Sequence, residues 1–158
     1  MRKKSILDLI INVPGIGFNE IARRTNLSNG VVTHYILQLL KDEMIIKSGT
    51  RAKYFHYKVP EKDLKLLITL RNNTNRDIIE FLLSVEFPVT AKKITKAVKK
   101  SRSTVSVNLK KLEKMQIVRR KILNQNTKLT SDIGFYISNN EYVKKIFSKY
   151  NLDIKNEP

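Results

Sequence analysis

Positively charged side chains are concentrated in one stretch of the 158-residue chain, between residues 92 and 128. The stretch holds 13 Lys or Arg and one acidic residue, Glu113, so its net charge is +12, whereas the other 121 residues supply only +5 of the total of +17. So many uncompensated cations repel one another, and a polyanionic partner relieves that repulsion. The chemistry within reach of this stretch is therefore the binding of phosphate groups, on nucleic acid or on an anionic membrane surface.

For any single Lys a solvated surface position is the ordinary interpretation, but a cluster of this density favours phosphate binding. The candidate phosphate contacts in the basic stretch are Lys92, Lys93, Lys96, Lys99, Lys100, Arg119, Arg120, Lys121 and Lys128. A smaller set of candidates lies earlier in the chain and comprises Arg23, Arg24, Arg51 and Lys53.

Two segments carry side chains of the types that contact base edges in duplex DNA. In residues 102–114, Val105, Leu109 and Leu112 recur at helical spacing, which defines an inward face. The outward candidates for base contacts are Arg102, Ser103, Ser106 and Lys110 in this segment, and Asn29, Thr33, His34 and Gln38 in residues 29–42. For the earlier segment two interpretations stay open: base reading, or the polar surface of a domain with another task, such as dimerisation.

Other kinds of chemistry find little support in the sequence. The chain has no Cys, which excludes disulfides and thiolate zinc sites. Its only histidines, His34 and His56, have no carboxylate at a metal-ligand spacing, so we expect neither a metal nor a cofactor. No Gly-rich phosphate loop, nucleophile elbow or paired-carboxylate motif occurs, and we expect a protein that is not an enzyme.

A membrane segment is not expected either. No stretch approaches the roughly 18 uninterrupted apolar residues of a membrane-spanning helix. The apolar run near the N-terminus is broken by Asp8 and Asn12, which argues against a signal peptide. We therefore expect a cytoplasmic protein associated with the nucleoid, with double-stranded DNA rather than a membrane as its partner.

The elements that would position these side chains occur twice. The segment SNGVVTHYILQLLKDEMIIK at 28–47 and the segment SRSTVSVNLKKLEKMQIVRR at 101–120 space their apolar residues alike, 73 positions apart. Accidental periodicity is the alternative, but a true repeat accounts for the match along the whole copy. The offset of 73 aligns nine apolar pairs: Ile6/Ile79, Leu9/Leu82, Ile10/Leu83, Ile16/Val89, Ile21/Ile94, Val32/Val105, Ile36/Leu109, Leu39/Leu112 and Ile45/Val118.

The repeat predicts the same order of elements in each copy. The first copy is predicted to have helices over 3–13, 20–26 and 29–42, with Asn19 and Ser28 as N-caps. A hairpin follows, with strands in MIIK and YFHYKV, and Pro60 opens a helix over about 61–71. The second copy is predicted to have helices over about 76–85, 91–98 and 102–114, strands near 117–123 and 133–138, and a helix over about 140–150.

The hairpins of the two copies differ in length. Beyond the hairpin turn the predicted offset becomes 79, which pairs Tyr57 with Tyr136 and Leu67 with Ile146. The second hairpin is therefore predicted to be six residues longer than the first. The aromatic residues on these strands alternate and are assigned to core packing and hairpin support rather than base stacking; they are Tyr54, Phe55, Tyr57, Phe135 and Tyr136.

The segment SRSTVSVNLKKLEKMQIVRR resembles the recognition helix and first wing strand of winged-helix regulators of the MarR and ArsR type. The segments YFHYKVPEKDLKLL and GFYISNNEYVKKIF resemble the way in which ArsR-like domains leave the wing and enter their last helix. Two such copies resemble the small two-winged-helix regulators that are common in archaea. The resemblance implies a mainly α fold with small β-hairpin wings, in two tandem winged helix-turn-helix domains at residues 1–73 and 74–158.

One departure from the family pattern concerns the end of the recognition helix. The family usually has Gly there, in a left-handed conformation, whereas this chain has Glu43 and Gln116. Either these residues adopt the left-handed conformation, or the turn into the wing differs.

The leading hypothesis from the sequence is a DNA-binding transcriptional regulator whose second copy supplies most phosphate contacts. The alternatives are a nonspecific architectural or chromatin protein, and a winged-helix module that binds proteins of the transcription or replication machinery. The predicted helix at 61–71 has apolar residues at 64, 67, 68 and 70, more than one helical face needs. It is expected either to pack between the two copies or to pair with another chain, and of these the homodimer is favoured.

Overall fold

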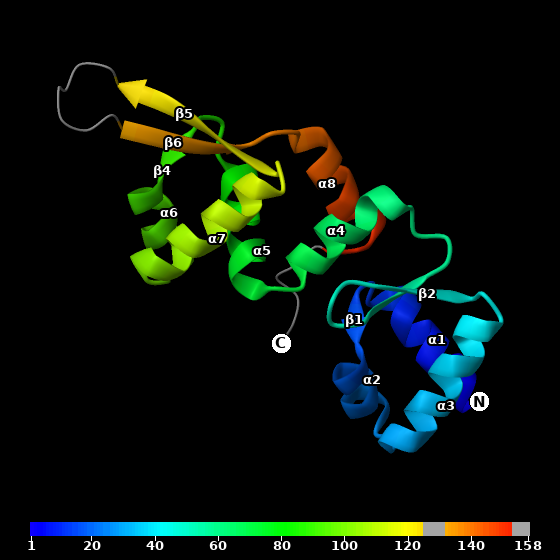
Figure 1. Cartoon of the computed structure of the whole chain (residues 1–158). Coiled ribbons are helices and arrows are strands. Elements are labelled where there is room, and N and C mark those ends of the chain that lie inside the picture. The colour runs from blue at the N-terminus through cyan, green and yellow to red at the C-terminus, as the bar shows by residue number, and fades with distance from the viewer. Residues whose placement is uncertain (125–131, 153–158) are drawn as a thin grey trace. The chain divides into compact units, whose positions relative to one another are not determined.

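The computed structural model describes residues 1–124 and 132–152 of the chain, which folds as two compact units, Met1–Arg71 and Asn72–Pro158 (Figure 1). Each unit has three helices with a two-residue strand after the first, then a β-hairpin and a final helix. The expected fold class, mainly α with small β-hairpin wings, is confirmed.

Unit 1 forms a small antiparallel sheet in the order β1-β3-β2. Ile16 of β1 pairs with Tyr54 of β3, and Ile45 of β2 pairs with His56, so β3 lies in the middle of the sheet. The elements of unit 1 are α1 (Arg2–Asn12), β1 (Ile16–Gly17), α2 (Phe18–Thr25), α3 (Asn29–Lys41), β2 (Ile45–Ser48), β3 (Lys53–His56) and α4 (Glu61–Leu70).

Unit 2 repeats this topology with the sheet order β4-β6-β5. Val89 of β4 pairs with Phe135 of β6, and Val118 of β5 pairs with Ile137. The elements of unit 2 are α5 (Asn73–Ser84), β4 (Val89–Thr90), α6 (Ala91–Val98), α7 (Arg102–Lys114), β5 (Val118–Asn124), β6 (Asp132–Ile137) and α8 (Asn140–Lys149).

The repeated apolar positions form the cores. Removal of these side chains from water is what fixes each helix against its neighbours, so their spacing determines the fold. Six of the nine aligned pairs are buried in both copies, and in the other three one member is half-buried. The six pairs are Ile6/Ile79, Ile21/Ile94, Val32/Val105, Ile36/Leu109, Leu39/Leu112 and Ile45/Val118.

The predicted register of the second hairpin is wrong by two residues. The residue that pairs with Ile45 is His56, and the residue that pairs with its counterpart Val118 is Ile137, which is an offset of 81 rather than 79. The second hairpin is thus eight residues longer, and the connection from its last strand to α8 is two residues shorter than the connection from β3 to α4. The counterpart of Tyr57 is therefore Ser138 and not Tyr136.

Two predicted helix starts also need correction. Asn19 is not an N-cap, because α2 already begins at Phe18 and Gly17 occupies the cap position. The first helix of unit 2 begins at Asn73 rather than near 76, because the side chain of Asn72 accepts a hydrogen bond from the amide of Asn75. Ser28 occupies the predicted cap position of α3, although its side chain makes no capping hydrogen bond.

The assignment of the strand aromatics to the core is right for some and wrong for one. Tyr54 and Phe55 are both buried, so both faces of β3 are covered, and Phe135 is buried in unit 2. Tyr136 is half-buried. Tyr57 is 52 % exposed, because it lies just beyond the end of β3 rather than within it.

Candidate nucleic-acid interface

In each unit the second and third helices form a helix-turn-helix. The first helix of the pair ends in a left-handed residue, Asn26 after α2 and Lys99 after α6, both with φ 53°. This conformation reverses the chain within two residues, so that α3 and α7 can begin at once. Ser101 then caps α7, because its Oγ accepts a hydrogen bond of 3.1 Å from the amide of Thr104.

The residues that follow α3 and α7 stand where the family pattern usually has Gly, and the structure shows which conformation they adopt. Glu43 and Gln116 adopt the left-handed conformation, with φ 54° and 60°. After α7 the amide of Gln116 donates to the carbonyl of Glu113 at 2.9 Å and the amide of Ile117 donates to that of Leu112 at 3.0 Å. These are the two hydrogen bonds of a Schellman motif. The chain therefore turns from the helix into the wing strand through the left-handed conformation that glycine adopts most easily. Glu43 and Gln116 adopt it at a steric cost that glycine would not have.

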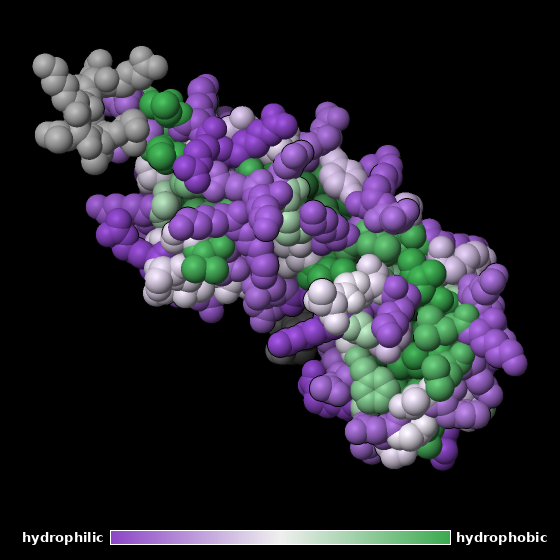
Figure 2. Space-filling view, in the orientation of Figure 1, coloured by the Kyte–Doolittle hydropathy of each residue, from purple (hydrophilic) through white to green (hydrophobic). Residues whose placement is uncertain are grey.

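The basic residues of unit 2 lie exposed on α6, on the turn and on α7. Figure 2 shows mainly hydrophilic residues over these elements, whereas a broader apolar area is visible over α1 and α3 of unit 1. Among the residues that the structure describes, none of these cations has an acidic side chain within ion-pair distance. The exposed cations of these elements are Lys92, Lys93, Lys96, Lys99, Lys100, Arg102, Lys110, Lys111 and Lys114.

The wing of unit 2 holds two kinds of cation. Arg119 and Lys121 are exposed on β5 without an ion pair among the described residues. Arg120, between them, donates from Nε and Nη2 to the two carboxylate oxygens of Glu113 at 2.5 and 2.7 Å. The hydrogen bond and the charge of Glu113 raise the pKa of Arg120. Lys128, the last candidate, lies outside the described residues.

The base-contact candidates of unit 2 all lie exposed on α7. Arg102, Ser103, Ser106 and Lys110 are exposed, whereas Val105, Leu109 and Leu112 of the same helix are buried. Ser103 Oγ lies 3.0 Å from Ser101 Oγ, so the hydroxyl at the start of the helix is linked to the cap.

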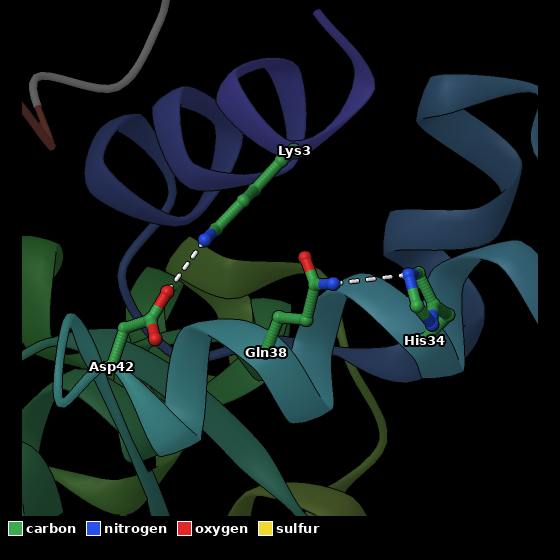
Figure 3. A network of polar contacts seen from close by, with 4 residues as sticks. All are labelled: Lys3, His34, Gln38 and Asp42. Carbon is green, nitrogen blue, oxygen red and sulfur yellow. Dashed lines mark hydrogen bonds and ion pairs between the residues drawn. The ribbon is translucent and has the colours of Figure 1, made fainter.

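The base-contact candidates of unit 1 lie on the corresponding face of α3. Asn29, Thr33 and His34 are exposed, and Gln38 is half-buried. Gln38 Nε2 lies 3.1 Å from His34 Nε2, one helical turn away (Figure 3). If the amide nitrogen of Gln38 donates, this His34 nitrogen accepts, and the amide oxygen of Gln38 is left for another donor. Nearby, Lys3 of α1 forms an ion pair of 2.5 Å with Asp42 at the end of α3.

Some of the cations of unit 1 form ion pairs within that unit. Glu20 on α2 binds Arg24 at 2.8 Å and Arg71 at 2.5 Å. Burial raises the pKa of Glu20, but the hydrogen bonds and charges of Arg71 and Arg24 outweigh it, and the net pKa falls below its ordinary value. Arg23 and Arg51 are exposed and Lys53 is half-buried, each without an ion pair among the described residues.

Sequence reasoning missed two of the ion pairs that cross between elements, Glu20–Arg71 and Glu113–Arg120. Their members lie 51 and seven residues apart, with no periodic pattern that joins them. His56 was expected near the wing and lies on β3, where burial and then the charge of Lys58 lower its pKa. In the described part of the chain no three His, Cys or acidic side chains gather into a metal site. No helix there is long and apolar enough to cross a membrane.

Comparison with known families agrees with this geometry. Residues 2–46 match the model of winged helix-turn-helix DNA-binding domains, and residues 72–124 match the model of the bacterial regulatory protein arsR family. Each match covers the helix-turn-helix of one unit. The chain therefore carries two winged helix-turn-helix domains in tandem. Helix-turn-helix proteins of these families are DNA-binding proteins and not enzymes.

A particular relative is an uncharacterised helix-turn-helix-type transcriptional regulator of Methanocaldococcus jannaschii. It is 34 % identical to this chain over 122 residues, which cover 75 % of this chain and 30 % of the relative. The matched part thus spans under a third of the length of that protein.

Proposed function

We propose that the chain is a transcriptional regulator that binds double-stranded DNA through both units, with unit 2 as its electrostatic anchor. The observation that carries this proposal is the group of nine exposed cations on α6, the turn and α7, none of which forms an ion pair with another residue that the structure describes. In a helix-turn-helix these elements lie against the phosphates that border the major groove. Contacts of this kind position a protein on DNA and carry no sequence information.

Unit 1 is proposed as the unit that reads bases. Its helix α3 offers Asn29, Thr33 and Gln38, whose side chains match the donors, acceptors and methyl groups of adenine and thymine. Between Asn29 and Leu40 the helix has no charged side chain that would bind phosphate instead. On this proposal the protein acts in the cytoplasm on the nucleoid.

A second candidate task for unit 1 is favoured by Leu37, whose side chain is 60 % exposed on the same helix. An exposed apolar residue among uncharged neighbours suits contact with a protein, and a homodimer is the simplest such assembly. In α4, by contrast, Leu66, Leu67 and Leu70 are already buried within the chain. Sedimentation at micromolar concentration distinguishes the two tasks, since base reading by a single chain predicts the mass of a monomer.

Selection of bound sites from random duplex DNA tests the proposed function most broadly. A regulator should enrich a defined sequence, and unrelated duplex should compete for it poorly. Enrichment of no sequence, with equal competition by unrelated duplex, would instead indicate a nonspecific architectural protein. Absence of DNA binding at low salt would leave a protein-interaction module as the remaining interpretation.

A further inference from the structure

A bidentate ion pair crosses the joint between α7 and the wing of unit 2. Glu113 lies in the last turn of α7, and Arg120 is the third residue of β5. The two hydrogen bonds, at 2.5 and 2.7 Å, join the planar guanidinium of Arg120 to both oxygens of the Glu113 carboxylate. Two parallel bonds fix the relative orientation of the planar groups, which a single contact does not.

Arg120 is restrained from the hairpin side as well. Its guanidinium lies 5.8 Å from the centre of the Phe135 ring, and Phe135 is its cross-strand partner in the sheet. This pairing places Arg120 on the same face of the hairpin as the buried Phe135, although the Arg120 side chain stays 54 % exposed. Arg119 and Lys121, its neighbours on β5, lie on the opposite face by the alternation of the strand.

The joint itself is short and carries a long hairpin. Only residues 115–117 separate α7 from β5, and Gln116 among them is left-handed. On the other side Ser138 Oγ donates to the carbonyl of Gln116 at 2.6 Å. A change in angle at this joint would displace Asn124, at the end of the seven-residue strand β5, further than the same change would displace Ser48 at the end of the four-residue strand β2.

Unit 1 supplies the internal comparison. The positions that correspond to Glu113 and Arg120 at the offset of 73 are Leu40 and Lys47, which cannot form an ion pair. The position of Ser138 is taken by Tyr57, whose amide donates to the carbonyl of Met44 at 3.1 Å. The pair is therefore present in the unit with the longer hairpin and absent from the unit with the shorter one.

We propose that the Glu113–Arg120 pair is a strut that sets the angle of the wing to α7, and that Arg120 is a positioning residue rather than a phosphate contact. The inference rests on the proposed function, in which α7 and the wing of unit 2 bind DNA. To turn the two N–H groups that bind Glu113 toward phosphate, Arg120 would have to exchange its carboxylate partner for the DNA and leave Glu113 uncompensated. The neighbouring cations meet phosphate without any such exchange.

The test uses the full chain and a variant that conserves net charge, Glu113→Gln with Arg120→Gln. The matched control is Arg119→Gln, the adjacent unpaired cation. DNA affinity is measured against salt on one duplex. A second readout, without DNA, is the distance between spin labels on Lys114→Cys and Asn124→Cys, which are unique sites because the chain has no other Cys.

The strut predicts that the double variant keeps the salt slope of the parent, loses affinity by about two- to five-fold, and broadens the distribution of label distances. Arg119→Gln should lower the slope by about 0.9 and leave the label distances unchanged. An equal loss of slope in the double variant, or an unchanged label distribution, overturns the strut. If Arg119→Gln and Lys99→Gln both leave the slope unchanged, the proposed function fails instead, and the label distances alone decide on the strut.

Discussion

The two units share one backbone fold but differ in the net charge of their helix-turn-helix segments. From α2 to α3, residues 18–41, unit 1 has Arg23, Arg24 and Lys41 against Glu20, a net charge of +2. From α6 to α7, residues 91–114, unit 2 has nine cations against Glu113, a net charge of +8. Both stretches nevertheless form the same pair of helices, with left-handed residues 73 positions apart. The apolar positions determine the fold, and the outward positions are free to specify the task.

The units also differ in where their charges go. In unit 1, Glu20 draws Arg24 and Arg71 into an internal cluster, which ties α2 to the residue after α4. In unit 2 the position that corresponds to Glu20 is Lys93, which is exposed. The position that joins an internal ion-pair cluster in unit 1 thus carries a solvent-exposed cation in unit 2. Substitutions in the core, on the helix surfaces and at a helix end test this difference between the two units.

The largest expected effect comes from a matched pair of core substitutions. Ile36→Ala and Leu109→Ala remove equivalent buried side chains from α3 and α7, and each should lower the free energy of unfolding of its unit by about 2–5 kcal/mol. Denaturant unfolding measures the loss. If unit 2 is the anchor, Leu109→Ala should abolish tight DNA binding in conditions where Ile36→Ala only weakens it. Equal losses of affinity in the two variants would contradict the assignment of unit 2 as the electrostatic anchor.

Substitutions on the outer face of α3 test whether unit 1 reads bases. Asn29→Ala, Thr33→Ala or Gln38→Ala should each relax the preference at one base pair by roughly 1–3 kcal/mol. None removes a charge, so the salt dependence of binding should not change. Binding to the selected site and to scrambled duplex measures both quantities. If specificity and affinity survive all three changes, unit 1 is a dimerisation or partner-binding domain.

The ion-pair cluster of unit 1 should depend on pH. Because the pKa of Glu20 is lowered by folding, the unfolded chain binds its proton more readily, and the stability from this group is present above pH about 4.5. That stability is lost as the pH falls through the lower folded value. Glu20→Gln should destabilise unit 1 by about 1–2 kcal/mol at pH 7 and by less in acid. Glu61→Gln, an exposed control, should do neither; equal loss at all pH values would exclude the cluster as the cause.

The left-handed residues give the smallest expected effect. Gln116→Gly should raise the stability of unit 2 by about 0.5–1 kcal/mol, because glycine removes the steric cost of φ 60° but gains entropy in the unfolded chain. Gln116→Ala should be close to neutral, because alanine keeps the same strain. Thermal unfolding measures both, and destabilisation by Gly would show that the Gln116 side chain contributes contacts of its own.

The sequence predicted most helices because their apolar spacing recurs at a fixed offset. The same offset could have identified the correct start of α2. Thr90 caps α6 through the amide of Lys93, and the residue 73 positions before Thr90 is Gly17, which occupies the cap position of α2. The hairpin register was beyond reach for a definite reason. An insertion of eight residues in the hairpin and a deletion of two after it sum to six, and alignment of the flanking helices reveals only the sum.

The candidate site was predictable only in outline. Exposure of the cations on α6 and α7 follows from helical periodicity once the apolar face is known. The pairing of Arg120 with Glu113 does not, because it depends on how β5 leaves α7 after the left-handed Gln116. Similarly, the hydrogen bond between His34 and Gln38 is compatible with their spacing of four but not required by it.

The central claim, that phosphate contacts are concentrated in unit 2, is tested most directly by the salt dependence of DNA affinity in two matched triple variants. One variant replaces Lys93, Lys96 and Lys100 by Gln, and the other replaces Arg23, Arg51 and Lys53 by Gln, so that each removes three positive charges from the same chain. The slope of log affinity against log salt should fall by about 2–3 for the first variant and by less than about 1 for the second. A larger fall for the unit 1 variant, or equal falls, would contradict the claim.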